Sequence, residues 1–276
     1  MKKSFAVSAS AMTLAAVFSM PAVAYEEVSG HVEKEGGGFV GVGVISKPDY
    51  EGSDDNTTTA APFGRYNWAS GRFVSLGGTG GSESAARLRF NLVTRDVSEN
   101  WTMGPLLQYR LERDDDMDNG QVKRMEKVDA ATELGAFIGY QSGAWAADVS
   151  FAADVSDEHD GYLMYVKGSY DLVKTSTTTL VLGVNATWAD DDYMDTYFGV
   201  NSSNVGTSGL PFYNAGDGWK NIGASLTGFY RFNKTWGMAA NIAYTSMRND
   251  AEDSPLVDGV GDQNQVNGIL AVTYSF

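Results

Sequence analysis

The chain has 276 residues and carries 35 acidic against 20 basic side chains, which gives a formal net charge of −15 at pH 7. This acidity argues against nucleic acid as a partner, because contacts to phosphate need an excess of Lys and Arg. The sequence contains no cysteine, so disulfides are excluded and the fold must rest on packing and backbone hydrogen bonds.

Residues 1–24 have the pattern of a secretory signal peptide. Lys2 and Lys3 precede a largely apolar run over residues 5–18, and Ala22-Val23-Ala24 supplies a small-x-small cleavage pattern. The apolar run is shorter than the roughly 18–20 residues that a membrane-spanning helix needs. We therefore predict export and cleavage before Tyr25.

After residue 38 the dominant pattern is an alternation with a period of two, which predicts β-strands. Many segments have about the 9–11 residues of a tilted membrane strand. No stretch is apolar for long enough to form a membrane helix, so a membrane location would require a closed barrel, in which no sheet edge faces lipid. The predicted strands are twelve segments, at residues 38–45, 60–67, 72–77, 86–94, 101–111, 131–140, 144–155, 161–172, 178–188, 221–232, 236–247 and 267–276.

The last nine segments each have one face without Asp, Glu, Lys or Arg, whereas the facing of the first three is ambiguous. In segment 86–94, Leu88 and Phe90 share the apolar face, and Arg87 and Arg89 lie on the other. A shift by one residue would turn both arginines toward lipid, at about 2–4 kcal/mol each near the membrane midplane. The pattern therefore fixes which face is which.

Two further patterns favour a membrane barrel over a soluble one. The gaps between segments alternate between short turns and long polar loops, as in outer-membrane barrels. Aromatic residues on the apolar faces gather near both ends of the strands, at the heights where such rings settle in a bilayer interface. The aromatic girdle is predicted to contain Trp101, Tyr140, Trp145, Tyr170, Trp188, Phe232, Trp236 and Phe276.

The predicted fold is an all-β transmembrane antiparallel up-and-down barrel of about twelve strands, with short periplasmic turns and long extracellular loops. It would occupy residues 38–276, preceded by a periplasmic N-terminal tail at 25–37. The final apolar stripe, from Leu270 to Phe276, would face lipid where the last strand pairs with the first.

Several short motifs lie in order along the chain. They comprise Pro48, Tyr50 and Gly52; Tyr193, Tyr197, Phe198 and Gly199; Ser208, Gly209 and Leu210; and Ser254 and Pro255. In this order and spacing the chain resembles the MltA-interacting protein / outer membrane protein V family over nearly all of its length after residue 24. The resemblance implies a non-enzymatic outer-membrane barrel. The family is named for a member that links a lytic transglycosylase to a peptidoglycan synthase, and other members are associated with osmotic response, adhesion or antibiotic susceptibility.

Residues with the chemistry for catalysis or metal binding are sparse. The two histidines are His31, in the predicted tail, and His159, in a run of four polar residues (157–160) typical of a solvated turn. We therefore predict no enzyme activity, no catalytic residue and no cofactor. Asp114, Asp116 and Asp118 approach a calcium-loop pattern, but the twelfth position is methionine instead of glutamate, which predicts loose cation binding at most.

Charged residues on the inward faces form the most informative candidate set. They are Arg87, Arg89, Arg110, Glu133, Asp148, Lys167, Asp171 and Arg231. Such groups either pair into a network that plugs the barrel or line a narrow aqueous path, and the sequence leaves both open. Inward glycines, including Gly104 and Gly135, are expected to leave room for large side chains that cross the lumen.

Three functions follow as hypotheses. The first is a monomeric outer-membrane scaffold, in contact with lipid and lipopolysaccharide, that docks a periplasmic lytic transglycosylase and a peptidoglycan synthase. The second is a narrow channel for small solutes or antibiotics, and the third is an adhesin that acts through the long loops. The scaffold rests on the resemblance alone.

Overall fold

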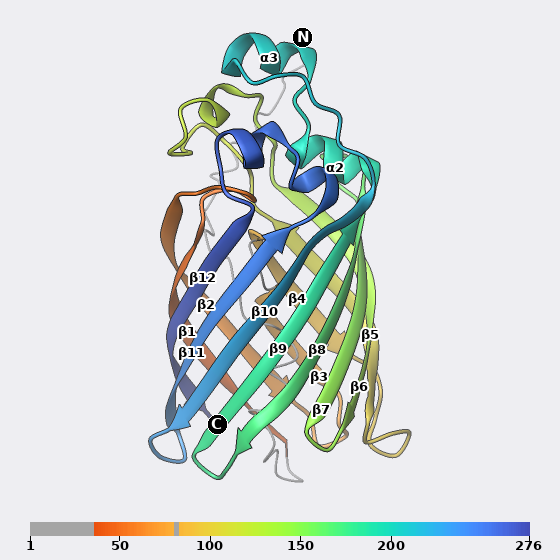
Figure 1. The fold of residues 1–276 in the computed structure, drawn as a ribbon. Coiled ribbons are helices and arrows are strands. Elements are labelled where there is room, and N and C mark those ends of the chain that lie inside the picture. The colour runs from red at the N-terminus through yellow and green to blue at the C-terminus, as the bar shows by residue number, and fades with distance from the viewer. Residues whose placement is uncertain (1–35, 80–82) are drawn as a thin grey trace, which may run out of the picture.

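The protein is a closed barrel of twelve antiparallel strands, seen in a computed structural model that describes residues 36–79 and 83–276 (Figure 1). Each strand pairs with its neighbours in the chain, and β1 pairs with β12 to close the wall. The strands are β1 (Gly37–Pro48), β2 (Asn56–Asn67), β3 (Phe73–Gly78), β4 (Ala85–Asn91), β5 (Trp101–Arg110), β6 (Ala131–Ser142), β7 (Trp145–Asp154), β8 (Tyr162–Lys174), β9 (Thr178–Ala189), β10 (Gly218–Arg231), β11 (Trp236–Met247) and β12 (Asn264–Ser275). The predicted fold class is confirmed. The predicted signal peptide, and the predicted tail up to residue 35, lie outside the described residues.

Connections at the two ends of the barrel differ as predicted. One end has short turns, and the other carries longer segments that fold back as a cap (Figure 1). The cap contains regular structure that the alternation could not reveal. Its helices are α2 (Asp191–Phe198), α3 (Ser202–Ser208), the 3-10 helices η1 (Val122–Arg124) and η2 (Asn249–Ala251), and the π-helical turn η3 (Pro255–Gly259). Among the described residues, no helix is long and apolar enough to cross a membrane.

The alternation of side chains along the strands puts apolar residues outside and polar residues inside. Val40, Val42 and Val44 of β1 are each more than half exposed, which settles the facing of a strand that the sequence left ambiguous. Leu88 and Phe90 of β4 also face outward, and the two arginines between and beside them are buried inside. An outer surface of this composition is stable only against lipid.

Aromatic rings gather at both rims of the outer surface. At the short-turn end, Trp101 packs on Tyr140 with ring centroids 4.8 Å apart, and Trp145 packs on Tyr170 at 4.5 Å. Also at this end, the rings of Phe232, Trp236 and Phe276 are exposed. At the cap end, Trp188 packs on the ring of Tyr162 at 5.5 Å.

The barrel interior has an apolar side and a polar side. A cluster that includes Phe39, Ile45, Phe63 and Ile269 lies inside the wall formed by β1, β2 and β10–β12. The buried charged residues lie mainly on the opposite wall, from β4 to β8. A second apolar cluster beneath the cap joins residues of α2 to inward residues of the strands.

Candidate functional site

The cap is assembled from the motif residues identified in the sequence. The Tyr50 hydroxyl donates to the carbonyl oxygens of Leu256 (3.2 Å) and Val260 (3.3 Å), and thereby joins the β1–β2 loop to the β11–β12 loop. The Ser254 hydroxyl donates to the carbonyl of Phe198 at 2.6 Å. Segments more than fifty positions apart in the chain therefore form one layer over the barrel.

Helix α2 places two tyrosines of the motif inside the barrel mouth. The helix begins after Asp190, whose carboxylate accepts a hydrogen bond from the backbone N–H of Tyr193, a standard N-cap arrangement. The helix ends at Phe198, and the backbone N–H of the next residue, Gly199, bonds to the carbonyl of Asp195. Tyr193 and Tyr197 stack with centroids 4.5 Å apart, and both are buried.

A second helix, α3, completes the outer part of the cap. The Asn201 side chain caps its N-terminus by accepting from the backbone N–H groups of Ser203 and Asn204. Gly209 follows the helix at a φ of 78°, a left-handed conformation that glycine adopts without strain. The Ser208 hydroxyl donates to the carbonyl of Asn204, and Leu210 is buried beneath.

Arg110 is the centre of a buried ionic network directly below α2. Its Nε donates to Oε1 of Glu133 at 2.7 Å, and its Nη1 lies 3.3 Å from Oε1 of Glu51. Its Nη2 lies 3.7 Å from Glu83 and donates to the hydroxyl of Tyr165 at 3.2 Å. Arg110 is 1% exposed, so one buried guanidinium contacts three carboxylates.

Lys220 supplies a second cation to the same carboxylates. Its Nζ lies 2.8 Å from Oε2 of Glu51 and 2.9 Å from Oε1 of Glu83, and it also donates to the Tyr193 hydroxyl at 3.2 Å. Burial raises the pKa of Tyr193 well above its usual value, so its hydroxyl keeps its proton and donates to Glu51 at 2.9 Å. Helix α2 is thereby bound to the network.

The network continues toward the other end of the barrel. Arg87 donates through Nε to the Gln108 side chain at 2.8 Å and through Nη1 to the Ser150 hydroxyl at 3.1 Å. Two residues further along β4, Arg89 pairs with Asp148. Within the described residues, paired and buried side chains thus cross the lumen at several levels.

His159 differs from the expectation of a solvated turn. Asp157 and Asp160 do form the tight turn, with φ values of 61° and 55°. The imidazole, however, is buried, with Nε2 lying 3.3 Å from Oε1 of Glu133 and the ring packed edge-on against Tyr193. The turn directs this side chain inward, where it extends the network under the cap.

Acid is expected to weaken the network through Glu83, which lies in the β3–β4 connection outside the strands. Burial alone would raise the pKa of Glu83, but Lys220 and Arg110 beside it lower the pKa from 4.5 to about 2. A carboxyl whose pKa is lowered by folding stabilises the fold fully above its unfolded pKa, and this contribution is lost as the pH falls through the folded pKa.

The thermal unfolding midpoint in detergent should therefore drop as the pH falls from about 4.5 toward about 2. Glu83→Gln should start from a lower midpoint at pH 7 and fall less over that range, because it no longer carries this titration. An equal acid-induced fall in both proteins would contradict the assignment.

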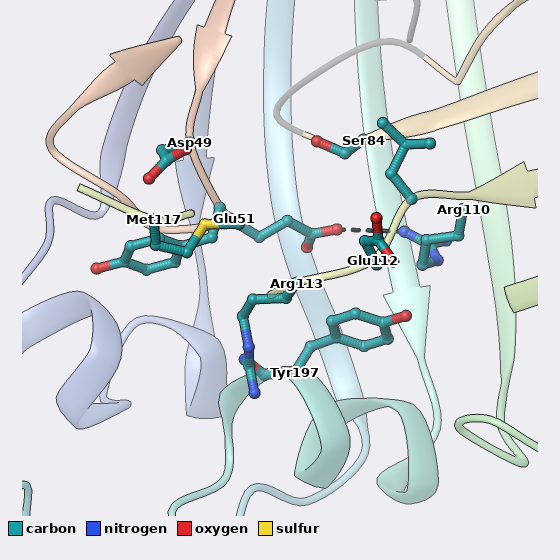
Figure 2. Close-up of a pocket in the computed structure, with 10 residues that line it drawn as sticks. Asp49, Glu51, Ser84, Arg110, Glu112, Arg113, Met117 and Tyr197 are labelled. Carbon is teal, nitrogen blue, oxygen red and sulfur yellow. Dashed lines mark hydrogen bonds and ion pairs between the residues drawn. The ribbon is translucent and has the colours of Figure 1, made fainter. Parts of the chain in front are cut away.

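The described residues form one cavity on the cap side of the network and another at the short-turn end. The outer one has a volume of about 30 Å³, enough for a water molecule, and lies between the β1–β2 and β5–β6 connections. Figure 2 shows Glu51 and Arg110 meeting across it, with Arg113 and Tyr197 beside them. The inner one, named the periplasmic vestibule here, has a volume of about 570 Å³ at the short-turn end and is lined by the ends of β1, β2 and β9–β12 with their turns.

Six of the eight lumen residues named in the sequence belong to, or adjoin, the network. Arg87, Arg89, Arg110, Glu133 and Asp148 are members, and Lys167 donates to the carbonyl of Thr79. The other two lie near the short-turn end, where Asp171 pairs with Lys174 at 3.1 Å and Arg231 lines the vestibule. Five further members of the Arg110 network were not predicted from the sequence: Glu51, Glu83, Lys220, Tyr165 and Tyr193.

Carboxylate clusters in the cap show no built metal site. Asp190, Asp191 and Asp192 bring their oxygens within 4.8 Å of one another, but Asp190 is already used as the N-cap of α2. In the β5–β6 connection, Asp114 accepts from the backbone N–H of Asp116, a local turn contact.

Comparisons with known proteins identify a family and several similar chains. The family described as "MltA-interacting protein MipA" matches residues 40–276. The chain is 28% identical to outer membrane protein OmpV of Vibrio cholerae serotype O1 over 50% of this chain and 52% of that protein. It is 26% identical to MltA-interacting protein of Escherichia coli strain K12, over 46% and 49%. The chain thus spans about half the length of the curated relatives it matches.

Among solved structures, an outer membrane channel from Pseudomonas putida F1 aligns with a TM-score of 0.46 and 12% identity, covering 88% of this chain and 96% of that one.

Proposed function

The chain belongs to the MltA-interacting protein MipA family, and from this membership we propose that it is an outer-membrane scaffold. In this role it holds a periplasmic lytic transglycosylase, together with a peptidoglycan synthase, at the cell envelope. The name of the Escherichia coli relative, MltA-interacting protein, supports the first of these partners.

The closed lumen is the observation that favours a scaffold. The network around Arg110 crosses the barrel beneath a cap that is itself fastened by Tyr50 and Ser254. A barrel that is closed in this way has its outer ends, rather than an open pore, available for interaction. Docking by a periplasmic enzyme would use the short-turn end.

The β4–β5 turn offers the most exposed large apolar side chain at that end. Val97 of this turn (92–100) is 74% exposed, and it lies outside the lipid-facing rows of the strands. Isolated apolar residues on a polar surface are common. Substitution of Val97 therefore tests whether this turn is the docking contact.

Val97→Asp is expected to reduce recovery of a purified MltA-type lytic transglycosylase on the immobilised barrel by about tenfold or more, because it places a charge in the contact. The matched control is Phe212→Asp, which changes a residue that is 63% exposed in the cap, at the opposite end. The control should bind like the unaltered protein. If the unaltered barrel recovers no lytic transglycosylase, the scaffold proposal is wrong.

Export through a cleaved signal peptide, a monomeric state and contact of the cap with lipopolysaccharide complete the proposal. The acidic cap loops would share divalent cations with lipopolysaccharide phosphates. The signal-peptide pattern of residues 1–24 supports export, and the outer-membrane barrel fold supports contact with lipopolysaccharide.

A narrow channel is the second candidate, and one observation favours it. The outer cavity and the vestibule lie on the two sides of the Arg110 network. Displacement of the network would connect them into a path from one side of the membrane to the other. The conductance measurement described in the Discussion addresses this alternative.

A further inference from the structure

The periplasmic vestibule differs in charge from the rest of the lumen. Arg231 and Lys234 both line it, and none of the described residues in its lining is Asp or Glu. Neither cation forms an ion pair within the part of the chain that the structure describes, whereas Arg89 and Arg110 deeper in the lumen are paired with carboxylates. The lining thus holds two cationic side chains together with the terminal carboxylate of Phe276, and Arg231 and Lys234 are suited to contact an anionic ligand.

Asn67 adds a buried donor that has no partner. Its Oδ1 accepts from Nε of Arg65 at 2.8 Å, which fixes the amide so that Nδ2 is the remaining group. Nδ2 is buried and makes no hydrogen bond within the structure, although Asn67 is only 5% exposed and lines the vestibule. An orphaned buried donor is unfavourable, and an acceptor on a ligand would satisfy it.

The remaining lining is suited to a ligand with many hydroxyl groups. Hydroxyl side chains come from the β8–β9 turn, the β10–β11 turn and β12, and the rings of Phe39 and Phe229 supply apolar surface. The hydroxyl residues are Thr175, Ser176, Thr177, Thr179, Thr235, Thr273 and Ser275. The volume of about 570 Å³ lies within the range of small-molecule sites, about 300–1,000 Å³.

We propose that the periplasmic vestibule is a binding site for a carboxylated sugar, with Arg231 and Lys234 contacting the carboxylate and Asn67 donating to a sugar oxygen. Because the Arg110 network closes the barrel above it, a ligand that enters from the periplasm binds in a dead end instead of passing through. This site is independent of the docking proposal, which concerns the outer surface of the turns.

Calorimetric titration of the purified full chain in detergent tests the proposal with two matched pairs of probes. Glucuronic acid is compared with glucose, and N-acetylmuramic acid with N-acetylglucosamine, so that each pair isolates the carboxylate. We expect at least one acid to bind in the millimolar range or tighter, about tenfold or more above its neutral counterpart. The tighter acid identifies whether a uronic acid or a muramic acid is the better ligand. Equal binding of acid and neutral sugar, no binding of either acid, or equally tight binding of acetate would overturn the proposal.

Three variants locate the site. Arg231→Gln with Lys234→Gln should abolish the preference for the acid, and Asn67→Asp, which keeps an acceptor for Arg65 but replaces the free donor, should weaken binding about tenfold. The matched control is Arg95→Gln, an exposed basic residue of the β4–β5 turn outside the vestibule, which should change nothing. Unaltered binding by the double variant would refute the assignment. If a variant fails to fold, the salt dependence of the unaltered protein decides, because added NaCl must weaken acid binding and leave neutral sugars unaffected.

Discussion

Arg110→Gln is expected to lower the free energy of unfolding of the barrel by about 3–5 kcal/mol, the cost of leaving buried charges without their partner. Glu51, Glu83 and Glu133 all contact this guanidinium, and Glu133 and Glu83 are almost completely buried. Lys220 forms ion pairs with Glu51 and Glu83, so these two carboxylates would keep a cation, whereas Glu133 would lose its ion pair with Arg110. The midpoint of urea unfolding in detergent, followed by the mobility of the folded band in unboiled gels, measures the change.

The same substitution on an exposed pair provides the control. Arg248 lies 3.7 Å from Glu252 in the cap, with both side chains partly exposed, and Arg248→Gln should cost about 0–1 kcal/mol. A similar effect of both substitutions would show that the Arg110 network contributes no more than a surface pair.

Planar-bilayer conductance of the Arg110 variant separates the two candidate functions. The unaltered barrel should be silent, and a barrel whose network is a gate should conduct once Arg110 is replaced. Silence of both proteins favours the scaffold. A steady conductance of the unaltered barrel would contradict a closed lumen.

Gly135→Ala is expected to destabilise the barrel by about 1–3 kcal/mol, the usual cost of forced overpacking. A Cβ added to Gly135 in β6 would overlap the backbone carbonyl of Phe151 in β7, so the two strands would have to move apart. Backbone atoms cannot rotate away as a flexible side chain can. The same unfolding measurement applies.

Gly77 of β3 is the matched control, because a Cβ there would meet no atom within 4 Å. Gly77→Ala should be neutral or slightly stabilising, since alanine restricts the unfolded chain. Equal losses at the two positions would point to a general cost of alanine in these strands. Gly135 is thus required for the close approach of two strands, and not to leave room in the lumen as its inward position suggested.

The facing of the strands was predictable because a charged side chain that faces lipid costs free energy. Arg87 and Arg89 had to point inward, and the resulting twelve-strand barrel is the predicted one. The bulge in β10 shows where the same reasoning fails. The register with β9 shifts between Trp219 and Asn221, so that Lys220 and Asn221 both point inward. The predicted strand began at residue 221, so Lys220 was assigned to the preceding loop. Strict alternation continued back from that strand would also have turned Lys220 outward.

The other missed partners come from segments without any periodicity. Glu51 and Glu83 lie in connections, and no pattern in a loop states that it folds back into the barrel. The motif around Tyr50 and Ser254 gave the positions that matter but not their contacts, which depend on pairing between loops more than two hundred residues apart. Helices α2 and α3 do carry sequence signals, because Asp190 and Asn201 are typical N-cap residues and a glycine follows each helix.

The distance along the chain between network partners has a consequence for how the barrel assembles. Glu51 and Lys220 are 169 positions apart and meet only when β1 and β12 have closed the wall. Until that step Glu51 and Lys220 are not paired with each other, and a charge without its partner must remain hydrated. Pairing of the final seam is therefore the step at which Glu51 and Lys220 exchange water for each other.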